Sequence, residues 1–164
     1  MYDSIRLAGI VLAAATAVGC ASIPETTGAL PDYSADPTYR TLNLNADFSP
    51  DPVVVQLESG GHIPASNVSA SCAGYIAEAP DARLNYSADD LPLILSVASR
   101  SDTTLVVNAP DGRWYCNDDG GVNGLNPSVR FNRPQSGQYD IWVGTFGSGA
   151  LESARLHISE VSSQ

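Results

Sequence analysis

Short apolar runs, each closed by turn-forming residues, follow one another along most of this 164-residue chain. Examples are PVVVQL at 52–57, LPLILSV at 91–97 and YDIWVGT at 139–145, where Tyr139, Ile141 and Val143 recur with the period of two of a half-buried strand. Turn residues such as Pro-Asp-Gly at 110–112 separate the runs, and no sustained helical period occurs beyond the first residues. We therefore expect an all-β domain over residues 39–162, an antiparallel, jelly-roll-like β-sandwich of about eight to ten strands.

The net charge of the chain limits which kinds of molecule it can bind. Asp and Glu number 18 against 8 basic residues, all of them arginine, so the formal net charge is -10. A surface of this sign repels phosphate backbones and anionic lipid head groups, which argues against nucleic acid as a partner. An acidic surface is better suited to remaining hydrated or to binding divalent cations.

The N-terminus has the pattern of an export signal. The apolar run LAGIVLAAATAVG at 7–19 has the length of a secretory-signal core and is shorter than the roughly 20 residues of a membrane-spanning helix. It ends in Ala17-Val18-Gly19-Cys20, which resembles a bacterial lipobox, although Ala17 stands where leucine is usual. The resemblance implies a signal helix at 1–19, lipidation of Cys20 and a membrane anchor. The alternative is an ordinary cleaved signal with a chance cysteine.

Residues 20–38 are rich in Pro, Ser and Thr and show no periodicity, so we expect a flexible, disordered tether there. Ala21 stands where the lipoprotein pattern would place aspartate for inner-membrane retention. The resemblance therefore implies an exported protein of the bacterial cell envelope, lipid-anchored in the outer membrane and facing the periplasm or the cell surface.

Two cysteines remain once Cys20 is set aside. In an exported protein the even pair Cys72 and Cys116 predicts one disulfide. A closed loop of that length, about 44 residues, stabilises the fold by about 4 kcal/mol in the chain-entropy model.

A family resemblance covers about residues 91–160. Its marks are Asp-Thr-Thr-Leu-Val-Val at 102–107, the Pro-Asp-Gly turn, the acidic loop after it and Ser-Gly-x-Tyr-x-Ile-x-Val at 136–143. This order resembles the bacterial pre-peptidase C-terminal domain, although the family usually has aspartate where Thr104 stands. The resemblance implies a β-sandwich module of the kind found beside secreted proteases and related to collagen- and carbohydrate-binding sandwiches.

The most unusual segment is the acidic loop that follows Cys116. Calcium takes six to eight oxygen ligands, and a glycine-rich loop can curl to present them. The candidate ligands are Asp102, Asn117, Asp118, Asp119 and Asn123. The alternative is a hydrated turn in which Asp and Asn side chains bond their own backbone. The sequence leaves both open and allows calcium as a stabilising cofactor.

Two tryptophans are candidates for ligand binding. Adjacent residues on a strand point to opposite faces, so Trp142 should lie away from Ile141 and Val143, and either Trp114 or Tyr115 should point outward. An exposed tryptophan beside Asp and Asn is how sandwich lectins hold sugars. The alternative is that Trp114 and Trp142 cover the open side of the sandwich or belong to the core.

No catalytic constellation is visible in the sequence. His62 lies in a turn context, His157 alternates with apolar residues in the last run, and Ser148 lacks the Gly-x-Ser-x-Gly pattern of a nucleophile elbow. We therefore expect a protein that is not an enzyme: a binding or scaffolding module for a glycan, a cell-wall polymer or a protein. The alternatives are a secreted hydrolase or peptidase, or its accessory domain, and a structural protein of envelope assembly.

Overall fold

The computed structural model describes residues 28–164; the predicted signal peptide, Cys20 and the first part of the predicted tether lie outside them. Sheet A contains seven strands: β1 (Arg40–Asn45), β3 (Ile63–Pro64), β4 (Tyr75–Ile76), β5 (Ala82–Ser87), β7 (Thr103–Asn108), β8 (Trp114–Asn117) and β10 (Gly137–Thr145). Sheet B contains four: β2 (Val53–Ser59), β6 (Leu93–Ser99), β9 (Ser128–Phe131) and β11 (Glu152–Ser159). Over the described range, no helix is long and apolar enough to cross a membrane.

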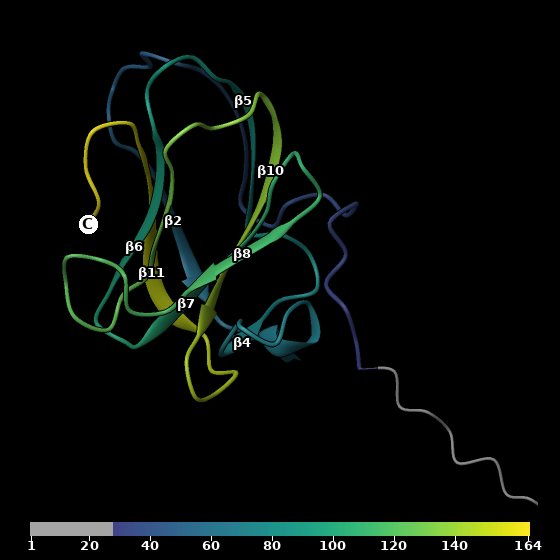
Figure 1. Ribbon diagram of the computed structural model, residues 1–164. Helices are drawn as coiled ribbons and strands as arrows, with labels where there is room; N and C mark the ends of the chain where they lie inside the picture. Colours follow the sequence, from purple (N-terminus) through teal and green to yellow (C-terminus); the bar gives the residue numbers. More distant parts are fainter. Residues whose placement is uncertain (1–27) are drawn as a thin grey trace, which may run out of the picture.

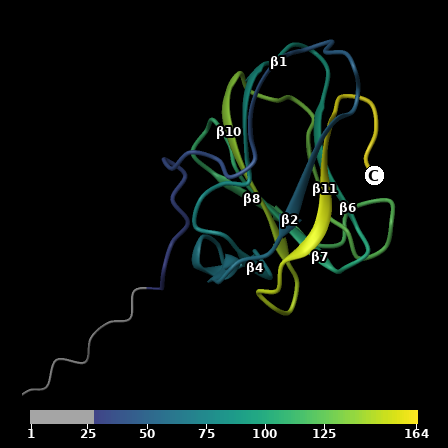
Figure 2. The same ribbon diagram turned by 180° about the vertical axis from the view of Figure 1, so that it is seen from behind.

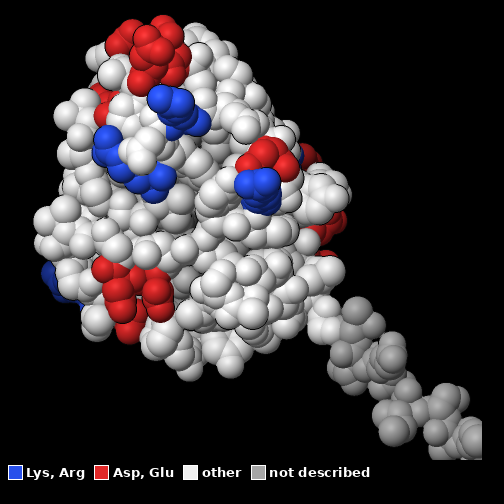
Figure 3. All heavy atoms as spheres, in the orientation of Figure 1, with Lys and Arg blue, Asp and Glu red and all other residues white. Residues whose placement is uncertain are grey.

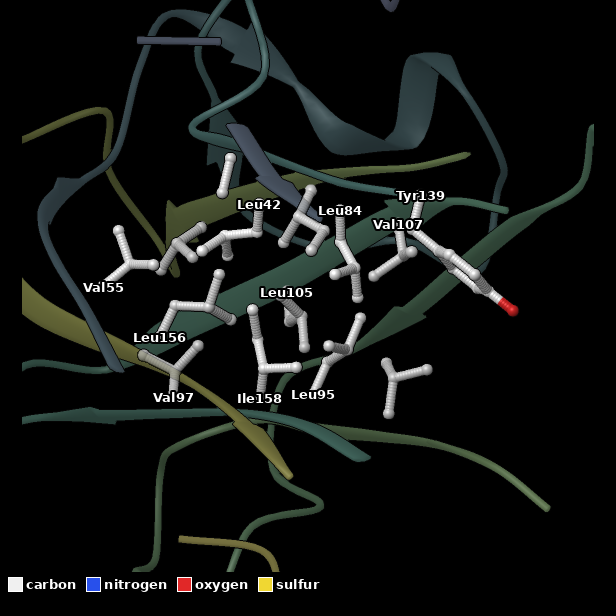
Figure 4. Close-up of a cluster of buried hydrophobic side chains, with 14 of the residues drawn as sticks. Leu42, Val55, Leu84, Leu95, Val97, Leu105, Val107, Tyr139, Leu156 and Ile158 are labelled. Carbon is white, nitrogen blue, oxygen red and sulfur yellow. The ribbon is translucent and has the colours of Figure 1, made fainter. Parts of the chain in front are cut away.

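The two sheets pack face to face, which confirms the predicted all-β sandwich (Figure 1). Alternation along each strand decides which side chains are inside: in β2, Val55 and Leu57 are buried and Val54 and Gln56 are exposed. Figure 4 shows the resulting core, whose labelled members are Leu42, Val55, Leu84, Leu95, Val97, Leu105, Val107, Tyr139, Leu156 and Ile158. Burial of these apolar side chains is the main favourable term for the fold.

Strand pairing departs from the expectation at one place. Sheet B has the order β2-β11-β6-β9 with every pairing antiparallel, and β2 and β11 lie side by side in Figure 2. In sheet A, β10 is paired antiparallel with β5, β7 and β4, but β1 runs parallel to β5, with Leu42 opposite Leu84. The sheet is therefore mixed. After β1 the chain crosses to sheet B, so no hairpin fixes the direction of β1 relative to β5.

A third layer covers part of the outer face of sheet A. It is formed by residues 63–76, which contain β3, the 3₁₀ turn η1 (Ala65–Asn67) and β4 and lie at the lower right in Figure 1. The pairing of β4 with β10 joins this layer to sheet A. A second apolar cluster fills the space beneath this layer: Ile63, Ala65, Cys72, Ile76, Val106 and Trp142, with Val68, Ala77, Trp114 and Cys116 packed against it. The predicted disulfide between Cys72 and Cys116 is present, with 5.3 Å between the Cα atoms, and it ties the layer to β8.

The predicted tether extends too far toward the C-terminus. Residues 32–38 lie against the domain: the Asp32 N–H donates to the carbonyl of Glu78 at 2.8 Å, and the Thr38 N–H to that of Pro80 at 2.8 Å. The Arg83 guanidinium, itself held by Asp140 at 2.6 Å, donates to the carbonyls of Tyr33 and Ala35 at 2.7 and 2.9 Å. Satisfied backbone groups fix this segment although its composition is that of a linker.

Candidate binding surface

Three loops meet at one end of the sandwich, and we call this region the loop end. It consists of residues 100–102, 118–127 and 146–151, which connect β6 to β7, β8 to β9 and β10 to β11. Figure 1 shows the two longer loops, green and yellow-green, projecting at the lower end of the molecule. Backbone hydrogen bonds connect the three loops. The Thr103 N–H donates to the carbonyl of Leu125 at 3.2 Å, and the Phe146 N–H donates to the backbone carbonyl of Asp102 at 3.0 Å.

The asparagines of the acidic loop hold its backbone. The Asn117 Oδ1 accepts from the N–H groups of Gly120 and Ser128 at 2.6 and 2.9 Å. Asn126 is buried and donates to the carbonyls of Ser99 and Asn123 at 3.0 and 3.2 Å. These bonds are the turn chemistry that was one of the two interpretations of the sequence. Asn126 was missed as a structural residue; its signal was only its place just before a proline.

Three of the predicted calcium ligands gather at the loop end. Burial raises the pKa of the Asp102 carboxyl, and the nearby charges of Asp119 and Asp118 raise this pKa further. The Asp102 Oδ1 is buried and has no hydrogen-bond partner. Figure 3 shows a compact acidic patch at the lower left, over the start of β7 and the β8–β9 loop.

The five predicted ligands do not form a complete set of oxygen donors. The side-chain oxygen of Asn117 already accepts a hydrogen bond from the backbone. The side chain of Asn123 is exposed, and its backbone carbonyl accepts from Asn126. Within residues 28–164 no group of three or more His, Cys, Asp and Glu side chains has the arrangement of a metal site. Calcium binding by this loop stays a prediction.

The loop end also exposes large apolar side chains, which the sequence analysis missed. The exposed fractions are 74% for Val122, 58% for Leu125, 43% for Phe146 and 64% for Leu151. Large apolar side chains exposed on loops at the same end of a fold make that end a candidate interaction surface. The signal available in the sequence was apolar residues inside the glycine-rich loops GGVNGLN and FGSGAL.

The predicted aromatic binding surface is absent at Trp142. Trp142 lies on the outer face of sheet A, as its alternation predicts, but it is 0% exposed because the third layer covers it. Trp114 is half-buried and packs against Trp142, with 5.3 Å between the ring centroids. The prediction that Trp142 stacks against a ligand is therefore wrong, and the alternative that the pair belongs to a core is correct for Trp142.

The candidate catalytic residues His62, Ser148 and His157 do not hydrogen-bond to one another in residues 28–164. His62 is exposed, and Ser148 lies exposed in the β10–β11 loop. His157 is buried, neither of its ring nitrogens has a partner, and burial followed by the charge of Arg155 lowers its pKa. Neither histidine makes a side-chain hydrogen bond to a serine or a carboxylate in the part of the chain that the structure covers.

Comparison with known proteins finds little. No family model matches the chain, and no curated protein matches it in sequence. Among solved structures the chain is similar to PliG of Aeromonas hydrophila, described as a periplasmic lysozyme inhibitor of g-type lysozyme, with 15% sequence identity and a TM-score of 0.37. The match covers 73% of this chain and 96% of PliG. A function for the chain must therefore be argued from its own surface.

Proposed function

We propose that this chain is an exported, lipid-anchored binding module whose loop end holds a protein partner with a basic and partly apolar surface, without turning it over. The observation that carries the proposal is the exposure of Val122, Leu125, Phe146 and Leu151 beside the carboxylates of Asp102, Asp118 and Asp119.

The chemistry of the loop end favours a protein over a sugar as partner. Exposed aliphatic and aromatic side chains gain most from burial against another apolar surface, and such anchors carry most of the binding energy in protein interfaces. A sugar cannot stack on Trp142, as it does on the exposed tryptophan of a sandwich lectin, because Trp142 is buried.

The charge of the loop end favours a basic partner. Three aspartates lie close enough to influence one another, in a chain whose formal net charge is -10. Complementary charge accelerates encounter and selects against acidic partners, while the apolar contacts slow dissociation.

Two features support export. The Cys72–Cys116 disulfide suits an oxidising compartment, and the lipobox-like Cys20 suits a membrane anchor. The two packed sheets are compatible with the fold that the pre-peptidase C-terminal resemblance implies, and we keep that family as a proposal.

The test begins with a photo-crosslinking residue at position 122, at the tip of the β8–β9 loop, and the same residue at position 91 as the control. Leu91 is 39% exposed and lies between β5 and β6, outside the loop end. We expect a crosslinked protein at position 122 and none at position 91, in cells that export the full chain.

Binding of that partner in purified form then decides the proposal. Phe146→Ser should weaken the Kd about tenfold or more, Leu91→Ser should leave it unchanged, and added salt should weaken binding by the wild type. Equal loss in both variants, or conversion of the partner to product, would contradict the proposed function.

A further inference from the structure

A surface hollow of about 670 Å³ lies where β2, β6 and β11 reach the loop end. Strands β2, β6 and β11 and the β8–β9 loop form its walls. Among the residues that line it are Gln56, Ala98, Arg100, Ser101, Asn123 and Arg155. Its volume falls in the range of small-molecule sites, roughly 300–1,000 Å³.

Strand register places two arginines on the same hollow. Ala154 and Leu156 point into the core, so Arg155 between them points outward, where it lies across from Gln56 on β2 and Ala98 on β6. Arg100 directly follows Ser99, the last residue of β6, which pairs with Ala154 next to Arg155, and both arginines line the hollow.

Neither arginine is neutralised by an ion pair. In residues 28–164 the arginines in ion pairs are Arg83 and Arg113, and both lie on sheet A or its loops. The carboxylates nearest to the hollow are Glu152, which lines it, and Glu58, which lies across from Ser153, and neither forms an ion pair with Arg100 or Arg155. Two free guanidinium groups therefore border one hollow of an otherwise acidic chain.

Beside the arginines and Glu152, the lining is uncharged: Leu57, Ala98 and Ala154 are apolar, and the other side chains are polar. Gln56, Ser101 and Asn123 offer amide and hydroxyl groups that can both donate and accept hydrogen bonds. This combination suits a ligand with many hydroxyl groups and some carboxylates. An arginine guanidinium matches a carboxylate in a two-pronged geometry.

A histidine lies on the same face, two residues farther along β11. His157 is 8% exposed, lies across from Val54 and Ser96, and has no partner for either ring nitrogen. Its pKa responds to the charge of Arg155, so it will also respond to an anion bound beside that arginine.

We propose that this hollow binds a carboxylated oligosaccharide, with Arg100 and Arg155 holding carboxylates and the neutral side chains holding hydroxyl groups. The hollow shares Arg100, Ser101 and Asn123 with the loop end but none of its exposed apolar side chains, and sugar binding can be measured without a protein partner. An acidic peptide would supply carboxylates without hydroxyl groups, so it satisfies only part of the lining.

The experiment measures binding of trigalacturonate to the folded chain by calorimetry and by backbone NMR. Its methyl ester, which lacks the charges, and triglutamate, which lacks the hydroxyl groups, are the matched ligands. We expect trigalacturonate to bind at least about tenfold more tightly than either, because it alone uses both kinds of contact. Amide shifts should concentrate at Gln56, Ser101 and Arg155.

The variant Arg100→Gln/Arg155→Gln should weaken the Kd for trigalacturonate about tenfold or more. Arg130→Gln/Arg133→Gln removes the same charge outside the hollow and should leave the Kd unchanged. In the wild type the imidazole signal of His157 should move on binding, while that of His62, which is exposed at the β2–β3 turn, should stay in place. This last readout does not depend on any variant's folding.

Three results would overturn the proposal: no binding of trigalacturonate at millimolar concentration, equal loss in the two double variants, or shifts that avoid the hollow and His157. Binding of triglutamate as tight as that of trigalacturonate would assign the hollow to acidic peptides and overturn the sugar assignment. None of these results bears on the photo-crosslinking at the loop end.

Discussion

The outer faces of the two sheets obey the same alternation but have opposite environments. On sheet A the outward positions Val106 and Trp142 are apolar and are covered by the third layer, which the Cys72–Cys116 disulfide ties in place. On sheet B the outward positions Gln56 and Arg155 are polar, and together with Ala98 they border an open hollow. The outward Ile94, Ser96 and His157 of sheet B are buried, so the part of this face that is free to bind is the part that borders the hollow.

The largest expected effect concerns the covered face. Trp142→Ala removes a fully buried side chain and should lower the free energy of unfolding by about 3–5 kcal/mol. The matched change on the open face, Arg155→Ala, should alter it by less than about 0.5 kcal/mol. Urea unfolding of both variants measures the difference, and similar values for the two would contradict the contrast between the faces.

The second effect concerns the Cys72–Cys116 disulfide. Replacing both cysteines, Cys72→Ser with Cys116→Ser, should lower the free energy of unfolding by about 2–4 kcal/mol, because the unfolded chain regains the freedom that the disulfide removes. Hydrogen exchange should then rise in residues 63–76 and stay unchanged in β2 and β11. An equal rise in both sheets would mean that the disulfide supports the whole sandwich and not the third layer alone.

The third effect is a pH dependence that originates at Asp81, a buried residue bonded to β10. Asp81 is buried, and burial raises its pKa to about 7, against a hydrogen bond from the Val143 N–H that lowers it. A raised folded-state pKa means that the native state holds the proton more tightly than the unfolded state between about pH 4 and 7. Stability should therefore fall as pH rises through this window, by at most about 1.4 kcal/mol per pH unit.

Asp81→Asn keeps an oxygen acceptor for Val143 and removes the charge, so it should flatten this pH dependence. The variant should gain most over the wild type above pH 7, where the wild-type carboxyl is charged. Thermal unfolding from pH 4 to 8 measures it. The lowered pKa of His157 makes stability rise with pH in both proteins, so the difference in Tm between them isolates Asp81. A difference that does not grow as pH rises from 4 to 8 would contradict the raised pKa of Asp81.

The smallest effect is that of calcium on the loop end. Because Asn117 and Asn126 already hold the loop backbone, we expect 1 mM calcium to raise the Tm by less than about 1 °C. A saturable rise that Asp118→Asn/Asp119→Asn abolishes would establish the calcium site that the acidic segment allows. Magnesium at the same concentration is the control for ionic strength.

The sequence predicted the features that depend on local pattern. The period of two in β10 placed Tyr139, Ile141 and Val143 in the core and Trp142 on the opposite side, as the structure has them. The disulfide was predictable because two cysteines remained after Cys20 and their pairing had no competitor.

The features that were missed depend on contacts between distant segments. No local pattern shows that β3 and β4 return to cover Trp142, that Arg83 fixes residues 33 and 35, or that β1 pairs with β5 in parallel. The exposed apolar residues of the loop end were missed for the same reason. Whether an apolar residue in a loop is buried depends on which distant segments pack against it, and the sequence does not show them.

Hydroxyl-radical footprinting tests the central claim most directly, since it measures the solvent access of individual side chains in the oxidised protein. The account predicts that Trp142 and Ile76 stay unmodified, although tryptophan is intrinsically the more reactive side chain, while Phe146, Leu125 and Leu151 are oxidised readily. Oxidation of Trp142 as fast as that of Phe146 would contradict it, because sheet A would then have an open outer face and its aromatic pair would be available to a ligand.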